Sequence, residues 1–209
     1  IQFNKGVYKI EKNKSPKKFN GKKANTINSK DLDKFIEMMK QASKPIFYTG
    51  GGVINSGPQA SELLRELIHV TGFPITSTLQ GLGAYPGDDH QFLGMLGMHG
   101  TYEANNAMHD CDLMINIGAR FDDRITGKID QFSPKSKKVH IDIDPSSIGK
   151  NVQVDLAIIS DVTELLKKVI TRFLKTQKVV YTTFIRSAMP HIRHLTRRQK
   201  NTLDRKPKA

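Results

Sequence analysis

Short apolar runs that end in polar or glycine-rich turns recur along this chain, and they limit what it can fold into. One run, at 113–117, leads directly into a charged turn at 118–124, and a second ends in the polar turn at 140–145. Strands that are buried on both faces, as in parallel sheets, read as continuous apolar runs of this kind. We therefore expect a parallel sheet whose carboxyl edge carries polar and glycine residues, which is where open α/β sheets bind ligands.

Amphipathic segments with helix-capping residues separate the runs. Ser29 is the expected cap of the first helix, Pro58 lies in the first turn of the second, and Gly72 ends that helix. Thr101 and Asp161 are the expected caps of two later helices. The expected strands lie at 45–49, 73–77, 113–117, 138–142 and 156–160. This alternation predicts an α/β fold: a doubly wound parallel sheet with helices on both faces, Rossmann-like, with basic extended flanks.

The net charge of +13 is distributed unevenly along the 209 residues. Residues 1–44 carry 12 basic and 4 acidic side chains, and residues 175–209 carry 10 basic and 1 acidic. The middle of the chain carries 11 basic and 15 acidic side chains, so its net charge is negative. Basic flanks can bind polyanions, but the patterned part of the chain is acidic, and we expect no nucleic-acid partner.

Patterning and charge together predict three parts. Residues 1–28 read as a linker, residues 29–175 as the folded domain, and residues 176–209 as an unpatterned basic tail. No apolar run is long enough to span a membrane, and no secretory leader is recognisable. Cys111 is the one cysteine of the sequence, which suits a reducing compartment, so we expect a cytoplasmic protein without a membrane partner.

Two loops are candidates for ligand contact. The three glycines at 50–52 follow a strand and precede a helix, which fits either a ligand cradle or a plain tight turn. Met98 and His99 lie between glycines before the helix that Thr101 caps, and they fit either a functional loop or ordinary surface and core positions. The sequence shows no nucleophile paired with a base and no metal-ligand spacing, so we expect no catalytic residue and no metal site here.

Charged residues follow two of the expected strands. Arg120, Asp122, Asp123 and Arg124 form either a mutually paired set or a ligand site, in which the arginine fork binds phosphate or stacks on a ring. We favour the ligand site. Asp142 stands where a carboxylate commonly accepts hydrogen bonds from ribose or ribityl hydroxyls.

Four long motifs resemble the large catalytic subunit of acetohydroxyacid synthase, also called acetolactate synthase. They cover roughly residues 30–170 in the family's order and spacing: KPIFYTGGGVINSG, TGFPITSTLQGLGAYP, FLGMLGMHGTYEANNAMHDCDLMINIGARFDDRITGKID and KKVHIDIDPSSIGKNV. Members of that family have three domains, each a parallel sheet with helices on both faces. The first and third bind thiamine diphosphate and Mg²⁺, and the middle one, which this chain resembles, binds FAD.

The resemblance implies a set of FAD-contacting positions. They are Gly51, Thr78, Leu79, Gln80, Leu96, Gly97, Met98, His99, Gly118, Ala119, Arg120, Phe121, Asp122, Asp142, Ile143, Asp161 and Val162. It also implies a substrate channel lined by Met98, His99, Asp123 and Arg124.

By the same resemblance the parent reaction is a transfer that forms a carbon–carbon bond, condensing pyruvate with a second 2-oxo acid in branched-chain amino acid biosynthesis. The implied partners are the flanking thiamine-binding domains, further copies of the subunit and a regulatory small subunit. The family's catalytic glutamate and metal-binding motif lie in the other domains, so we expect this chain alone to be inactive. The alternatives are the middle domain of another thiamine diphosphate enzyme and a non-catalytic flavin- or nucleotide-binding module.

Overall fold

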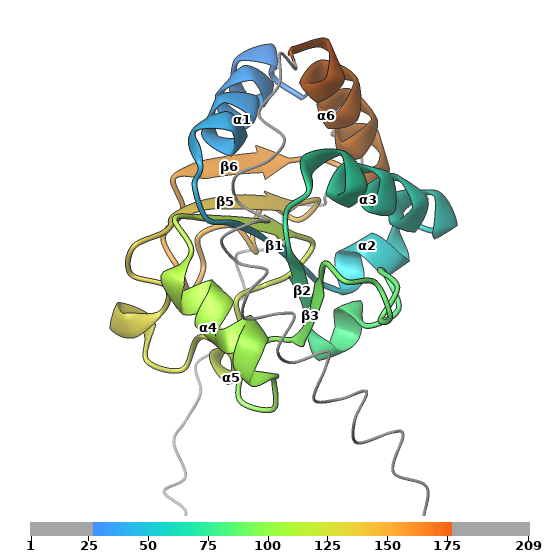
Figure 1. Ribbon diagram of the computed structural model, residues 1–209. Helices are drawn as coiled ribbons and strands as arrows, with labels where there is room; N and C mark the ends of the chain where they lie inside the picture. The colour runs from blue at the N-terminus through green and yellow to red at the C-terminus, as the bar shows by residue number, and fades with distance from the viewer. Residues whose placement is uncertain (1–26, 177–209) are drawn as a thin grey trace, which may run out of the picture.

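The computed structural model describes residues 27–176, whose strands form one six-stranded, all-parallel sheet (Figure 1). The strands are β1 (Pro45–Thr49), β2 (Ile75–Ser77), β3 (Phe92–Met95), β4 (Leu113–Ile117), β5 (Lys137–Asp142) and β6 (Leu156–Ile159). The helices are α1 (Ser29–Gln41), α2 (Gly51–Asn55), α3 (Pro58–Thr71), α4 (Tyr102–Asp110), α5 (Asp123–Thr126) and α6 (Val162–Thr176). Two short 3₁₀ turns, η1 (Leu79–Gly81) and η2 (Ile129–Gln131), complete the described elements.

The strand order is β3-β2-β1-β4-β5-β6. The chain runs outward from β1 to β3, returns to place β4 beside β1, and then runs outward in the other direction to β6. The reversal lies between β1 and β4, where Tyr48 is level with Asn116 and Thr49 with Ile117. This arrangement confirms the predicted doubly wound, Rossmann-like α/β fold, and it places the switch point after Thr49 and Ile117.

Three amphipathic helices, α1, α3 and α6, cover one face of the sheet, while α4 and α5 lie on the other side (Figure 1). Each of the three helices buries one apolar face, whose residues recur with the helical period of 3.6. This face packs against every second side chain of the strands, because successive strand side chains point to opposite faces of the sheet. The buried set includes Phe35 and Met39 of α1, Leu64 and Leu67 of α3, Leu165 and Val169 of α6, and Phe47, Ile115 and Val139 of the sheet.

The second face has a smaller core. Ala104 and Met108 of α4 pack there with Ile46, Tyr48 and Met114 of the strands. Because α4 has only nine residues, the loops that follow β4 supply the rest of the cover through Phe121 and Phe132. The loop after β4 is therefore part of this core as well as part of the carboxyl edge.

Helix ends follow the predicted capping, with one exception. Pro58 begins α3, Gly72 ends it in the left-handed conformation, and Thr101 caps α4 through the Ala104 N–H. The exception is α1, where Asn28 rather than Ser29 accepts the hydrogen bond from the Lys30 N–H. Ser29 is instead the first residue of the helix, which a serine also tolerates.

The structure contains elements that the pattern did not predict. Strand β3 lies within the glycine-dense segment, and the glycines at 50–52 open helix α2 rather than a plain turn. Strand β2 is shorter than the expected 73–77, beginning at Ile75. The expected linker at 1–28 and tail at 176–209 lie almost wholly outside the described residues, so both remain predictions.

Candidate functional site at the carboxyl edge of the sheet

The positions singled out in the sequence lie at the carboxyl ends of all six strands. Gly51 follows β1, Thr78–Gln80 follow β2, and 96–99 follow β3. On the other side, 118–122 follow β4, Asp142 ends β5 and Ile143 follows it, and 161–162 follow β6. Parallel strands place these ends along one edge of the sheet. At a strand spacing of about 4.8 Å, six strands make this edge about 24 Å wide. The structure thus brings segments that are distant in sequence into one row.

Three glycines close the switch point in the middle of this row. A Cβ atom on Gly50 would lie 2.3 Å from the Gly118 carbonyl oxygen, and one on Gly52 would lie 2.7 Å from the Gly118 Cα. The Gly50 N–H donates to Ile117 O and the Gly52 N–H donates to Gly118 O, each at 3.0 Å. The backbone itself fills the crevice, so a ligand at this point lies over the loops.

Two asparagines fix the loop after β4. The buried Asn116 accepts from the Ala119 N–H at 3.1 Å and donates to the Ala119 carbonyl at 2.7 Å. Asn151 donates to the Phe121 carbonyl at 2.9 Å. Phe121 has a φ of +50°, and its ring turns inward and is 2 % exposed. The neighbours of Phe121 in sequence, Arg120 and Asp122, are left on the surface.

The four charges after β4 divide into two groups. Arg120 donates to Asp122 at 3.1 Å, and its side chain is 70 % exposed. Asp123 accepts from the Arg124 N–H at the start of α5, and within residues 27–176 the Arg124 guanidinium forms no ion pair. The hypothesis of a fully paired set is therefore wrong for the described residues, and Arg124 is available to a ligand.

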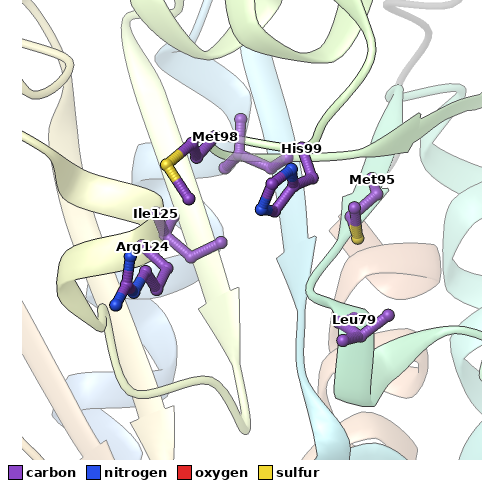
Figure 2. A pocket seen from close by; sticks show the side chains of 7 residues that line it. Leu79, Met95, Met98, His99, Arg124 and Ile125 are labelled. Atoms are coloured by element: carbon purple, nitrogen blue, oxygen red, sulfur yellow. The ribbon is translucent and has the colours of Figure 1, made fainter.

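A pocket of about 490 Å³ lies beside Arg124 (Figure 2). Its lining combines the loop after β3, the 3₁₀ turn after β2, and α5; the residues are Leu79, Met95, Leu96, Met98, His99, Arg124 and Ile125. Leu79 and Met98 are 66 % and 62 % exposed, so two large apolar side chains of this lining are open to a ligand. An apolar hollow with one cation and one imidazole suits an anionic ligand with an apolar body.

This pocket brings together five of the residues singled out from the sequence, namely Leu79, Leu96, Met98, His99 and Arg124. Sequence reasoning missed Met95 and Ile125, which complete the wall. Ile125 follows Arg124 in the chain, but no periodic pattern marked α5. Met95 ends a strand that was not predicted, so its place at the edge could not be recognised.

The loop after β3 is held by several short contacts. The Thr101 hydroxyl donates to Leu93 O at 2.6 Å, and its N–H donates to Met95 O at 2.9 Å. The Met98 N–H donates to Arg124 O at 3.0 Å, which ties this loop to α5. Met98 and His99 therefore project from a fixed backbone.

The ends of β5 and β6 carry carboxylates with local partners. Asp161 accepts from the Glu164 N–H at 3.2 Å, which confirms its capping role. Asp142 accepts from the Asp144 N–H at 2.9 Å through one oxygen. Beside it, Ile143 is 55 % exposed and offers an apolar surface at this end of the row. The expected role of Asp142 toward a ribose or ribityl hydroxyl remains a prediction.

Four of the positions implied for cofactor contact have buried side chains. Leu96, Ala119, Phe121 and Val162 are at most 3 % exposed. These residues therefore offer a ligand little surface: the Ala119 N–H and carbonyl are paired with Asn116, and the Phe121 carbonyl is paired with Asn151.

Unpaired polar groups lie under the loop after β4. The His140 ring meets Phe121 edge to face at 5.1 Å, and the Tyr48 ring lies 5.8 Å from Phe121. Neither ring nitrogen of His140 nor the Tyr48 hydroxyl has a hydrogen-bond partner within the described residues. Burial lowers the pKa of His140, and the negative charge of Asp142 opposes this shift. Burial, together with the charge of Asp122, raises the pKa of Tyr48. Both groups are therefore neutral near pH 7.

The described residues offer no alternative reactive centre. Burial raises the pKa of the Cys111 thiol, which also lies within hydrogen-bond distance of Ser133 and Met108 O. Among residues 27–176 no group of three or more His, Cys, Asp or Glu side chains could hold a metal ion. No helix in the same range is long and apolar enough to cross a membrane.

Comparison with known proteins assigns the fold to a family. The sequence model of the protein family described as "Thiamine pyrophosphate enzyme, central domain" matches residues 32–169. The chain belongs to this family. The match covers every strand and the whole carboxyl edge described above.

Acetolactate synthases are among the similar curated proteins. The acetolactate synthase large subunit of Haemophilus influenzae is 48 % identical over 137 residues, which are 66 % of this chain and 24 % of that protein. The large subunit of Mycobacterium tuberculosis is 46 % identical over 151 residues, 72 % of this chain and 24 % of that protein. The large subunit of Buchnera aphidicola is 44 % identical over 148 residues, which are 71 % of this chain and 26 % of that protein. The resemblance drawn from the motifs is confirmed, and the chain spans about a quarter of the length of these relatives.

Proposed function

We propose that this domain is the FAD-binding central domain of an acetolactate synthase large subunit. The thiamine pyrophosphate enzyme family and the names of its relatives, 44–48 % identical over the matched region, support the parent enzyme. The observation that carries the cofactor assignment is the row of strand-end loops. All seventeen positions implied by the resemblance lie in that row, although no single stretch of sequence holds them together.

The residues of this edge fit FAD in chemical type. Arg120 is an exposed fork for phosphate or for a ring face, and Asp142 and Asp161 are acceptors for hydroxyl groups. Leu79, Met98 and Ile143 are large apolar side chains left open at this edge. A row about 24 Å wide, with apolar groups at both sides and a cation near the middle, suits an extended dinucleotide.

In this proposal the domain binds and orients the flavin and supplies no catalytic residue. Gly51, Thr78, Gln80 and the loops at 96–99 and 118–122 are its main contacts, together with the ends of β5 and β6. By the family resemblance, FAD undergoes no net redox change in the main reaction. Met98, His99, Asp123 and Arg124 line the path of the 2-oxo acid beside it.

The proposal assigns the condensation of pyruvate with a second 2-oxo acid to a longer polypeptide. Thiamine diphosphate and Mg²⁺ are bound there by the flanking domains. Further copies of the subunit and a regulatory small subunit are its proposed partners.

Two measurements test this function. FAD is titrated against the 209-residue chain and against the full-length polypeptide, with flavin fluorescence as the signal. The full-length protein is then supplied with pyruvate, thiamine diphosphate and Mg²⁺, and acetolactate is measured after conversion to acetoin. We expect flavin binding and turnover from the full-length protein, and no turnover from the 209-residue chain. Turnover without flavin binding would contradict the cofactor assignment, and flavin binding without turnover would favour a non-catalytic flavin module.

A further inference from the structure

A side chain that does not line the pocket holds the backbone of the loop that forms one of its walls. Asn105, in α4, accepts from the Gly97 N–H at 3.1 Å and donates to the Gly97 carbonyl at 3.0 Å. Its amide nitrogen also donates to Thr101 O at 3.0 Å. One side-chain amide thus satisfies both backbone groups of a single residue, eight positions earlier in the chain.

The Gly97 peptide is confined on its other side by α5. Gly97 is buried with a φ of +104°, a conformation that L side chains rarely adopt. A Cβ atom there would lie 2.8 Å from Arg124 O and 2.7 Å from the Ile125 side chain. The peptide is therefore held between the Asn105 amide and α5. Removing the amide leaves the buried Gly97 N–H without a partner, while the Gly97 carbonyl keeps the hydrogen bond from the Gly100 N–H at 2.9 Å. An unpaired buried N–H is costly.

The next two residues depend on this peptide for their direction. Figure 2 shows Met98 on the side of Arg124, and His99 pointing into the space between Ile125 and Met95. Both residues are exposed, and within the described residues neither side chain forms an ion pair, so the path of the backbone at 97–99 sets where the two side chains leave the loop. Asn105 is not among the pocket-lining residues.

We propose that Asn105 is a positioning residue for the ligand pocket: its amide fixes the Gly97 peptide and thereby the wall formed by Met98 and His99. The proposal rests on the function proposed above, because it treats this wall as part of the flavin and substrate site. It predicts that ligand affinity depends on a side chain that does not touch the ligand.

Adjacent asparagines provide a matched test. Asn105→Asp keeps the acceptor for the Gly97 N–H, but at neutral pH it loses the donor and places a negative charge against two carbonyl oxygens. Asn106→Asp makes the same change one position later, at an exposed residue of the same helix. Lowering the pH to about 5 favours protonation of a carboxylate that faces carbonyl oxygens, and a protonated Asp both donates and accepts, as the amide does.

The experiment measures FAD affinity of the full-length protein and of both variants by fluorescence titration at neutral and acidic pH. We expect Asn105→Asp to bind FAD about tenfold more weakly at neutral pH and to recover toward the parent at acidic pH. Asn106→Asp should bind FAD with the affinity of the parent at both pH values. Asn105→Leu, similar in shape and uncharged, should bind weakly at both, and it replaces the aspartate variant should that one fail to fold.

Equal FAD affinity of the Asn105 and Asn106 variants would overturn the proposal. A parent protein that binds no FAD would instead contradict the proposed function, and the positioning role of Asn105 is then tested by NMR-detected hydrogen exchange. Faster exchange of the Gly97 and Met98 amides in Asn105→Asp than in Asn106→Asp supports this role, and equal exchange overturns it.

Discussion

Replacing Gly50 by alanine should push the loop after β4 away from the loop after β1 and destabilise the domain. The added Cβ would lie 2.3 Å from Gly118 O and 2.6 Å from the Ala119 Cβ, while real Cβ atoms essentially never lie within 3.0 Å of such neighbours. The obstacle is backbone, which cannot rotate away as a flexible side chain would. The loop after β4 must therefore move, although the Asn116 amide holds it through Ala119.

The cost follows from two contributions. Forcing extra volume into a packed region typically costs about 1–3 kcal/mol. Moving the loop also weakens the hydrogen bond from Gly50 N–H to Ile117 O, whose net contribution is about 0.5–1.5 kcal/mol. Together these effects predict that Gly50→Ala lowers the free energy of unfolding by about 2–4 kcal/mol.

Urea unfolding followed by circular dichroism measures this change, and Gly87→Ala is the matched control. A Cβ at Gly87 would meet nothing within 4 Å, and its backbone φ is not in the positive range. The control variant should therefore lie within about 1 kcal/mol of the parent. If Gly50→Ala proved as stable as the Gly87→Ala control, the close packing of β1 and β4 loops inferred here would be refuted.

Three further predictions concern the buried histidine, an anchoring carboxylate and the exposed arginine. Burial lowers the pKa of His140, so below about pH 6.5 the unfolded chain takes up a proton that the native chain does not, and the free energy of unfolding falls as the pH falls. In urea unfolding at neutral and acidic pH, His140→Gln should therefore lose less of this free energy than the parent. Asp112 accepts from the N–H groups of Ser43 and Lys44 at 2.6 and 2.8 Å, so Asp112→Ala should cost about 2 kcal/mol in urea unfolding, whereas exposed Asp110→Ala should cost under about 0.5 kcal/mol. Arg120→Lys should lose most FAD from the full-length protein on dialysis, about tenfold in affinity, and Lys128→Ala should retain it; equal retention would make Arg120 merely the partner of Asp122.

The buried strands and long helices could be predicted because their patterns are local. Strand β4, Leu113–Ile117, is an apolar run that is buried on both faces of the sheet, and the sequence marks both its ends. Helix α6 shows its buried face in the spacing of Leu165, Leu166 and Val169. Strand β3 could not be recognised, because it is an edge strand that is only half buried and contains Gly94 with a positive φ.

The site was predicted in part for the same reason. Residues that follow a strand lie at the carboxyl edge whatever the strand order, so positions such as Arg120 and Asp142 could be placed there from the sequence. Which loops meet depends on strand order, and the approach of α5 to the loop after β3 has no local signal. The inward turn of Phe121 and the reach of Asn105 back to Gly97 likewise depend on tertiary contacts.

Hydrogen exchange of the full-length protein with and without FAD tests the central claim most directly. The claim is that the flavin lies across the carboxyl edge, so FAD should slow amide exchange in the loops at 50–52, 78–81, 96–99, 118–122, 142–144 and 160–162. The loops at the opposite edge, at 42–45, 72–74 and 110–112, should exchange at unchanged rates. Protection confined to the opposite edge, or none at saturating FAD, would contradict the account.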